Sequence, residues 1–130
     1  MTHDVWQHAA ELFVAVTTLI RGLPASERFV FETQTRRAAR GVAASLAEGF
    51  RRWDLGDYVR SVSYASGSLG EVETDLHLIG RVNDVDATQL EQCRALADRT
   101  GRELTRLANS LRRLRQTKRP TRHPSDSRTE

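Results

Sequence analysis

The sequence predicts an all-α protein, an antiparallel four-helix bundle with up-down-up-down topology. Four successive segments carry apolar residues at alternating steps of three and four, which is the spacing of one helix face. Prolines occur only at positions 24, 120 and 124, so the strongest helix breaker is missing from the long central part of the chain. Links of about three to six residues require each helix to run antiparallel to the next.

The composition is that of a single soluble domain. The chain has 130 residues, of which 38% are hydrophobic and 28% charged, and no apolar run is long enough to span a membrane. A lone cysteine excludes an internal disulfide, and the N-terminal residues lack the pattern of a secretory signal. We therefore expect a cytoplasmic protein without a membrane contact. The net charge is only +3, so the distribution of its arginines must indicate any partner.

The first helix is expected to begin at the N-cap candidate Asp4 and to end at Gly22, before a turn at Pro24. Its predicted core stripe consists of Val5, Ala9, Leu12, Val16, Leu19 and Leu23. A second apolar row repeats every seven residues beside this stripe and consists of Trp6, Phe13 and Ile20. This row is either a broad core face or the interface of a homo-oligomer.

The second helix is predicted from the N-cap candidate Ser26 to about Gly49, and the third from the N-cap Asp54 to about Val82. The predicted core residues of these two helices are Phe31, Ala38, Val42, Leu46, Tyr58, Val62, Ala65, Leu69, Val72, Leu76 and Ile79. Both helices are rich in small residues, which predicts that they pack closely together. On the third helix we expect this contact at Ser63, Gly67, Gly70 and Thr74.

The fourth helix follows a turn at residues 83–86 and completes a bundle over residues 1–116. Its predicted core residues are Leu90, Cys93, Ala97, Thr100, Leu104, Leu107, Leu111 and Leu114. Residues 117–130 contain no aliphatic or aromatic side chain, so we expect a basic, disordered tail.

Residues 23–78 carry a recognisable series of motifs. These are Leu23-Pro24, Glu27-Arg28-Phe29, the block from Gln34 to Ala39, Ala47-Glu48-Gly49 with Arg52, Tyr58, and the block from Ala65 to Leu69 with Glu71 and Glu73. In these motifs the chain resembles the bacterial four-helix-bundle family of 23S rRNA-intervening sequence proteins. The resemblance implies a homopentameric, barrel-like assembly without catalytic activity and with an association to nucleic acid. A related branch resembles the accessory proteins of diversity-generating retroelements, which are basic pentamers that bind nucleic acid and a reverse transcriptase.

The residues that could support an enzyme or a metal site do not form the patterns that such sites need. Di-metal helical bundles use Glu-x-x-His motifs, and none occurs here. Glu73 and His77 are more typical of a surface pair than of a metal site, and Cys93 has the spacing of a buried side chain. No glycine-rich phosphate-binding loop is present. We expect a protein that is not an enzyme and uses no cofactor and no metal.

A polar network is predicted between the second and third helices. Gln34, Arg37 and Glu48 share one face of the second helix, and Arg37 could pair with Glu71 or Glu73 on the third. The alternative is that these residues bind a ligand.

Arginines of the fourth helix are the candidate contacts for nucleic acid. Arg99, Arg102, Arg106 and Arg113 form one stripe, although i,i+4 pairs with Asp98 and Glu103 also suit an ordinary solvated face. Beyond them lies a basic cluster without any acidic residue, which consists of Arg112, Arg113, Arg115, Lys118, Arg119 and Arg122. This cluster is either a binding surface for nucleic acid or a solubilising tail. In the second link, Trp53 either stacks on a base or pins the link to the bundle, and we favour pinning.

Together these features predict a homo-oligomeric scaffold, a pentamer by resemblance, that binds nucleic acid with little sequence specificity, RNA being the expected ligand. The alternative is an adaptor that docks a protein partner, such as the reverse transcriptase of a retroelement.

Overall fold

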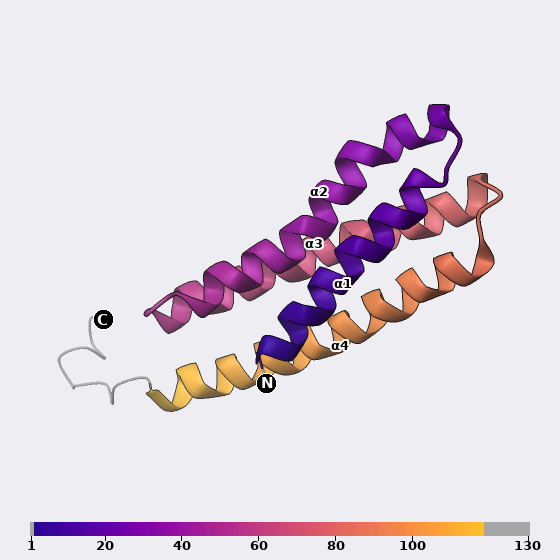
Figure 1. The fold of residues 1–130 in the computed structure, drawn as a ribbon. Helices are drawn as coiled ribbons and strands as arrows, with labels where there is room; N and C mark the ends of the chain where they lie inside the picture. The colour runs from indigo at the N-terminus through magenta and orange to yellow at the C-terminus, as the bar shows by residue number, and fades with distance from the viewer. Residues whose placement is uncertain (1, 119–130) are drawn as a thin grey trace.

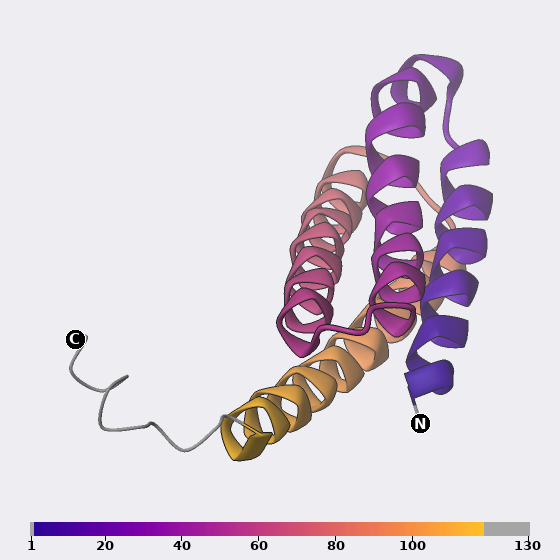
Figure 2. The ribbon, with the colours of Figure 1, turned by 90° about the vertical axis from the view of Figure 1, so that its left-hand side faces the viewer.

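Four helices account for nearly all of residues 2–118, which are the residues that the computed structural model describes. They are α1 (Thr2–Arg21), α2 (Ala25–Phe50), α3 (Leu55–Val82) and α4 (Ala87–Lys118). Both α1 and α3 pack against α2 and α4, so each helix lies beside its neighbours in the sequence and α4 closes the bundle against α1 (Figures 1 and 2). The predicted four-helix bundle is confirmed. Within residues 2–118, no helix combines the length and apolarity needed to cross a membrane.

Two of the three links end in an aspartate that caps the following helix. The Asp57 N–H donates to Asp54 Oδ2 at 3.1 Å, and the Gln89 N–H donates to Asp86 Oδ1 at 3.0 Å. These bonds satisfy backbone donors that the first turn of a helix leaves free. The predicted cap at Asp54 is therefore confirmed. By contrast, α2 begins after Pro24 without a side-chain cap, so the prediction of a cap at Ser26 is wrong.

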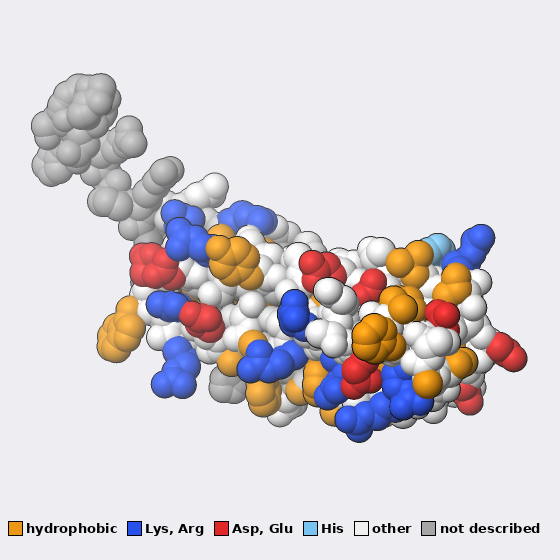
Figure 3. All heavy atoms as spheres, turned by 90° about the horizontal axis from the view of Figure 1, so that it is seen from above, with side chains coloured by type: hydrophobic (Ala, Val, Ile, Leu, Met, Phe, Trp, Pro, Cys, Tyr) orange, Lys and Arg blue, Asp and Glu red, His pale blue; other side chains and the backbone are white. Residues whose placement is uncertain are grey.

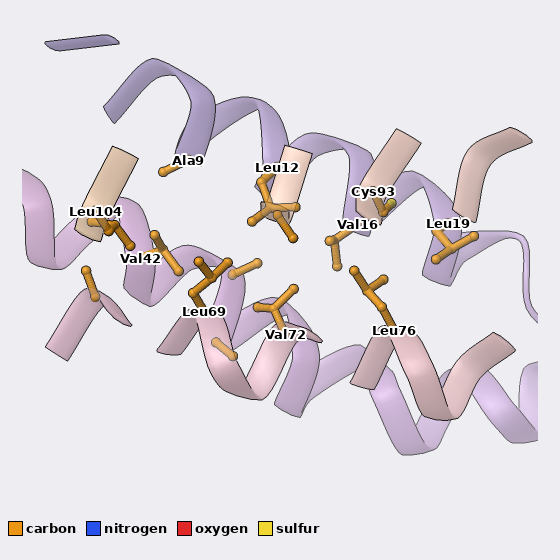
Figure 4. Packing of buried hydrophobic residues seen from close by; sticks show 14 of the residues in the cluster. Ala9, Leu12, Val16, Leu19, Val42, Leu69, Val72, Leu76, Cys93 and Leu104 are labelled. Atoms are coloured by element: carbon orange, nitrogen blue, oxygen red, sulfur yellow. The ribbon is translucent and has the colours of Figure 1, made fainter. Parts of the chain in front are cut away.

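The predicted stripes meet in one hydrophobic core. Figure 4 shows Leu12 and Val16 of α1 opposite Val72 and Leu76 of α3, with Cys93 of α4 near Val16. Every residue of the α1 stripe is buried, and so are the predicted core residues of α2. On α4 burial weakens toward the C-terminal end, where Leu107 is half-buried and Leu114 is exposed. The apolar spacing thus predicts the core correctly except at three positions: Tyr58 of α3 and Leu107 of α4 are half-buried, and Leu114 is exposed, while Leu111 is buried as predicted.

Small residues allow α2 and α3 to pack closely, as predicted, but they are not the residues predicted on α3. A Cβ atom added at Gly41 would lie 2.9 Å from Ser68 Oγ, and one at Gly49 would lie 3.0 Å from the Ser61 Cβ. Gly67 and Gly70, in contrast, face open space. The contact row of α3 is therefore the seven-residue repeat at 61 and 68, directly beside its core stripe.

Two polar contacts fix the positions of α1 and α2. The His8 Nδ1 and Glu103 Oε1 atoms are 2.8 Å apart, and both side chains are only 15% exposed, so this pair joins α1 to α4. The guanidinium of Arg36 donates to Thr17 Oγ1 at 3.2 Å and lies 5.4 Å from the centroid of the Phe13 ring, which joins α2 to α1.

Candidate nucleic-acid interface

The C-terminal part of α4 extends beyond α1. His8 of α1 lies beside Glu103, and the two helices are antiparallel, so Thr2, six residues before His8, lies alongside residue 109. At 1.5 Å per residue, the remainder of α4 up to Lys118 projects about 13 Å past the start of α1. Figures 1 and 2 both show this projection. We call residues 110–118 the overhang.

The overhang lies beside the start of α3. A Cβ atom added at Gly56 would be 3.3 Å from Nη2 of Arg115 and 3.2 Å from Oδ2 of Asp54. The guanidinium of Arg115 therefore lies over the first turn of α3 and close to the link between α2 and α3. This contact brings together two basic segments that are far apart in the sequence.

Charge is distributed unevenly along α4. Between Ala87 and Glu103 the helix carries three acidic and three basic residues, whereas from Leu104 to Lys118 it carries five basic residues and no acidic one. Cations at a helix C-terminus interact favourably with the helix dipole, which accounts for part of this pattern. Five cations and no acidic residue in this stretch of the sequence make it the most basic part of α4.

The predicted arginine stripe divides into two groups at this boundary. Arg102 pairs with Asp98, and Arg99 Nε lies 3.7 Å from Glu103 Oε2, so carboxylates of the same helix neutralise both arginines. The other two arginines of the stripe, Arg106 and Arg113, are exposed and form no ion pair with a described residue. The same holds for Arg112 and Arg115 of the acid-free cluster. The interface predicted from the sequence is thus concentrated near the overhang.

The last predicted contacts fall at or beyond the end of the structure. The helix α4 continues to Lys118, two residues past the predicted end of the bundle at 116. Arg119, Arg122 and the rest of the predicted tail up to residue 130 lie outside the described residues.

The link between α2 and α3 adds an aromatic ring to this basic end. Trp53 is fully exposed, so the prediction that it pins the link against the bundle is wrong. Its neighbours Arg51 and Arg52 are exposed as well. In Figure 3, basic side chains gather at the end from which the grey residues extend, together with acidic and hydrophobic side chains.

The predicted polar network does not form with Arg37. This side chain is exposed and makes no hydrogen bond or ion pair to any described residue, whereas the adjacent Arg36 contacts α1. Glu48 pairs instead with Arg52, one turn along α2. The prediction is therefore wrong for both residues.

The contacts between α2 and α3 use a different pair. The Thr35 hydroxyl donates to Asp75 Oδ2 at 2.7 Å, and Gln34 and Glu71 line a shallow depression beside this bond. Glu73 lies on the other side of α3, where partial burial and the negative charge of Asp98 on α4 raise its pKa. This polar contact between α2 and α3 is thus a hydrogen bond between two residues that the predicted network does not include.

The proposed interface row on α1 is only partly available to another molecule. Ile20 is completely buried in the core of its own chain, so its assignment to a subunit interface is wrong. Phe13 is half-buried beneath Arg36, and Trp6 is 40% exposed. The row drifts into the core toward the end of α1, because seven residues of an α-helix fall about 20° short of two full turns.

Other apolar side chains are exposed. A mainly apolar groove runs between α1 and α4, and its lining includes Val14, Ala15 and Leu96. Val14 is 63% exposed. At the α1–α2 turn, Phe29 and Val30 are 85% and 57% exposed. These positions were not singled out as an interface because they lie off the seven-residue rows.

The lone cysteine and the potential metal ligands are the last set of candidate residues. Cys93 is buried as predicted, and burial raises the pKa of its thiol to about 11. Among the described residues, no three His, Cys, Asp or Glu side chains come together in a group that could hold a metal ion.

Comparison with known proteins identifies the family of this chain. A sequence model described as 23S rRNA-intervening sequence protein matches residues 1–106. No curated protein matches the chain significantly. The family match covers α1, α2, α3 and the first part of α4, and it ends before the overhang with Arg112, Arg113 and Arg115. The chain belongs to the family of 23S rRNA-intervening sequence proteins, and its most basic helix end lies beyond the part that defines the family.

Proposed function

We propose that this protein is a homo-oligomeric helical scaffold, without catalytic activity, that binds nucleic acid through the arginines of the C-terminal part of α4. RNA is the expected ligand, and binding has little sequence specificity because arginine contacts to phosphates carry no information on the base. The setting is the cytoplasm.

The observation that carries this proposal is the distribution of charge on α4. Arg112, Arg113 and Arg115 are exposed, have no carboxylate partner among the described residues, and lie on a helix end that projects past α1. A projecting helix end gives a phosphate backbone access from several directions. Neutralising phosphates with arginines releases counterions, which favours binding at low salt.

Self-association would bring several of these basic helix ends together in one assembly. The apolar groove between α1 and α4 and the exposed Phe29 and Val30 are different patches of one chain, which suits a head-to-tail contact that closes into a ring. The family resemblance implies five chains. Such a ring carries five times the charge of +3 of one chain, or +15, and presents five overhangs.

Two measurements test the proposal. Fluorescence anisotropy with a labelled, structured RNA and a labelled duplex DNA is measured in about 50 mM and about 200 mM salt. We expect binding to both at the lower salt, and much weaker binding at the higher salt. Undetectable binding at the lower salt contradicts nucleic-acid binding and favours the adaptor role, in which the apolar groove docks a protein partner.

Light scattering at micromolar protein concentration measures the oligomeric state. We expect a mass of several chains for the natural protein and a smaller mass for Val14→Asp, which places a charge in the apolar groove. A natural protein with the mass of one chain contradicts the scaffold.

A further inference from the structure

We propose that Trp53 and the basic side chains around it form a stacking site for an unpaired base, so that this end of the bundle selects single-stranded RNA over duplex RNA. The inference rests on the proposed function and names the form of nucleic acid that this surface takes.

Trp53 is unusual because it is a large apolar side chain that the fold does not use. Its ring is fully exposed, although the side chains of the neighbouring helices bury a well-formed core. When a flat partner covers the face of an exposed indole, apolar surface is removed from water, which favours binding. A base is such a partner, and stacking of bases on aromatic side chains tolerates any base.

Hydrogen bonds hold the backbone on both sides of Trp53. The Arg51 and Arg52 N–H groups donate to the carbonyls of Glu48 and Gly49, both at 3.1 Å, which continues the last turn of α2 into the link. On the other side of Trp53, Asp54 caps α3. The residue therefore lies between two anchored points, so little backbone freedom is lost when a base binds.

The charges around the ring favour a phosphate backbone. Glu48 is paired with Arg52, whereas Asp54 accepts a backbone hydrogen bond and keeps its negative charge next to Trp53 in the sequence. Arg51 is exposed without a carboxylate partner among residues 2–118, and Arg115 lies over the next residues at Gly56. Cations from two elements, α4 and the α2–α3 link, thus lie at the end of the bundle that carries Trp53.

This combination fits a single strand better than a duplex. In a duplex the bases stack on one another, and a ring on a convex tip reaches only the phosphates and the groove edges. A single strand exposes the faces of its bases, so one base can stack on Trp53 while its phosphates contact Arg51 and Arg115.

Fluorescence tests the stacking directly. The chain has two tryptophans, so Trp6→Phe leaves Trp53 as the only indole, and circular dichroism checks that this variant is folded. We expect a labelled 20-nucleotide uridine RNA to bind and to quench the Trp53 emission, and a duplex RNA of the same length to bind without quenching. Binding of the single strand, seen by anisotropy, without quenching overturns the stacking site but leaves the proposed function intact. Absence of binding to either RNA overturns both.

Substitution of the ring gives a second measurement. We expect Trp53→Ala to weaken single-strand binding by about 5- to 150-fold, the range measured for loss of one stacked base, and to leave duplex binding unchanged. Trp53→Phe keeps an aromatic ring at this position, so it should retain most of the affinity for the single strand. An equal effect on both RNAs overturns the inference, and so does a smaller mass of Trp53→Ala in light scattering, which would place the ring in a subunit contact.

Discussion

Replacing the three arginines of the overhang by glutamine tests whether binding depends on where the charge lies. In the variant Arg112→Gln/Arg113→Gln/Arg115→Gln, three cations without carboxylate partners are lost from one helix end. Each arginine that neutralises a phosphate of a duplex contributes about 0.9 to the dependence of log K on log salt, so three contribute about 2.7 for each chain engaged. Between about 50 and 200 mM salt this corresponds to a loss of affinity of about 40-fold, and the variant should lack that part of the salt dependence.

A control with the same change in charge separates position from net charge. In Arg94→Gln/Arg99→Gln/Arg102→Gln, three cations are lost from the part of α4 whose charges balance, where Arg99 and Arg102 already have acidic neighbours. We expect its salt dependence to stay close to that of the natural protein. Anisotropy titrations with duplex RNA at four or more salt concentrations measure both slopes, and thermal unfolding checks that both variants fold. Equal slopes for the two variants would refute the reasoning, because net charge alone would then account for binding.

Three further predictions concern the core and its ionisable groups. Leu12→Ala removes a completely buried side chain that packs near Val72, so the free energy of unfolding in urea should fall by about 2–5 kcal/mol, and a loss well below 1 kcal/mol would contradict the packing shown in Figure 4. Because the pKa of Cys93 is raised to about 11, only about one thiol in a thousand is ionised at pH 8, so a thiol reagent should modify the unfolded chain rapidly and the native protein hardly at all. Glu73 has a raised pKa in the folded protein, so the folded state holds its proton more tightly than the unfolded state and stability falls as the pH rises through this range. Glu73→Gln should therefore be slightly more stable than the natural protein at pH 7 and lose this advantage at pH values below the ordinary carboxyl pKa; urea unfolding at both pH values checks the sign, and an advantage that grows on acidification would contradict it.

The architecture follows from apolar spacing because each helix has one face that must leave water. The buried residues of α1 and the following turn, from Val5 to Leu23, are those of the predicted stripe with the addition of Ile20 and Thr17. The cap at Asp54 was predictable because a short acidic side chain precedes the helix. The same signal was misleading at Asp4, which lies in the first turn of α1 and is not its N-cap, because the helix begins at Thr2. At the start of α2 the first turn follows proline, which fixes the backbone without any side-chain bond, so a serine in that turn was a misleading signal.

The predictions that were wrong concern residues whose contacts depend on tertiary structure. A rotation of 100° separates neighbouring helical residues, so Arg36 rather than Arg37 faces α1, and spacing along one helix cannot choose between them without the position of the partner helix. Trp53 could not be assigned because a ring in a link can fold back or extend. The overhang was not predictable either, because it depends on the offset between α1 and α4 that His8 and Glu103 set.

Covalent capture of bound RNA tests the central claim most directly, that nucleic acid binds at the end formed by the overhang and the α2–α3 link. A uridine-rich RNA is cross-linked to the natural protein by ultraviolet light, and mass spectrometry locates the modified peptides. We predict cross-links within residues 51–60 and 103–118, at the end where Arg115 lies over Gly56. Cross-links confined to the α1–α2 turn around Phe29, at the opposite end of the bundle, would contradict the claim.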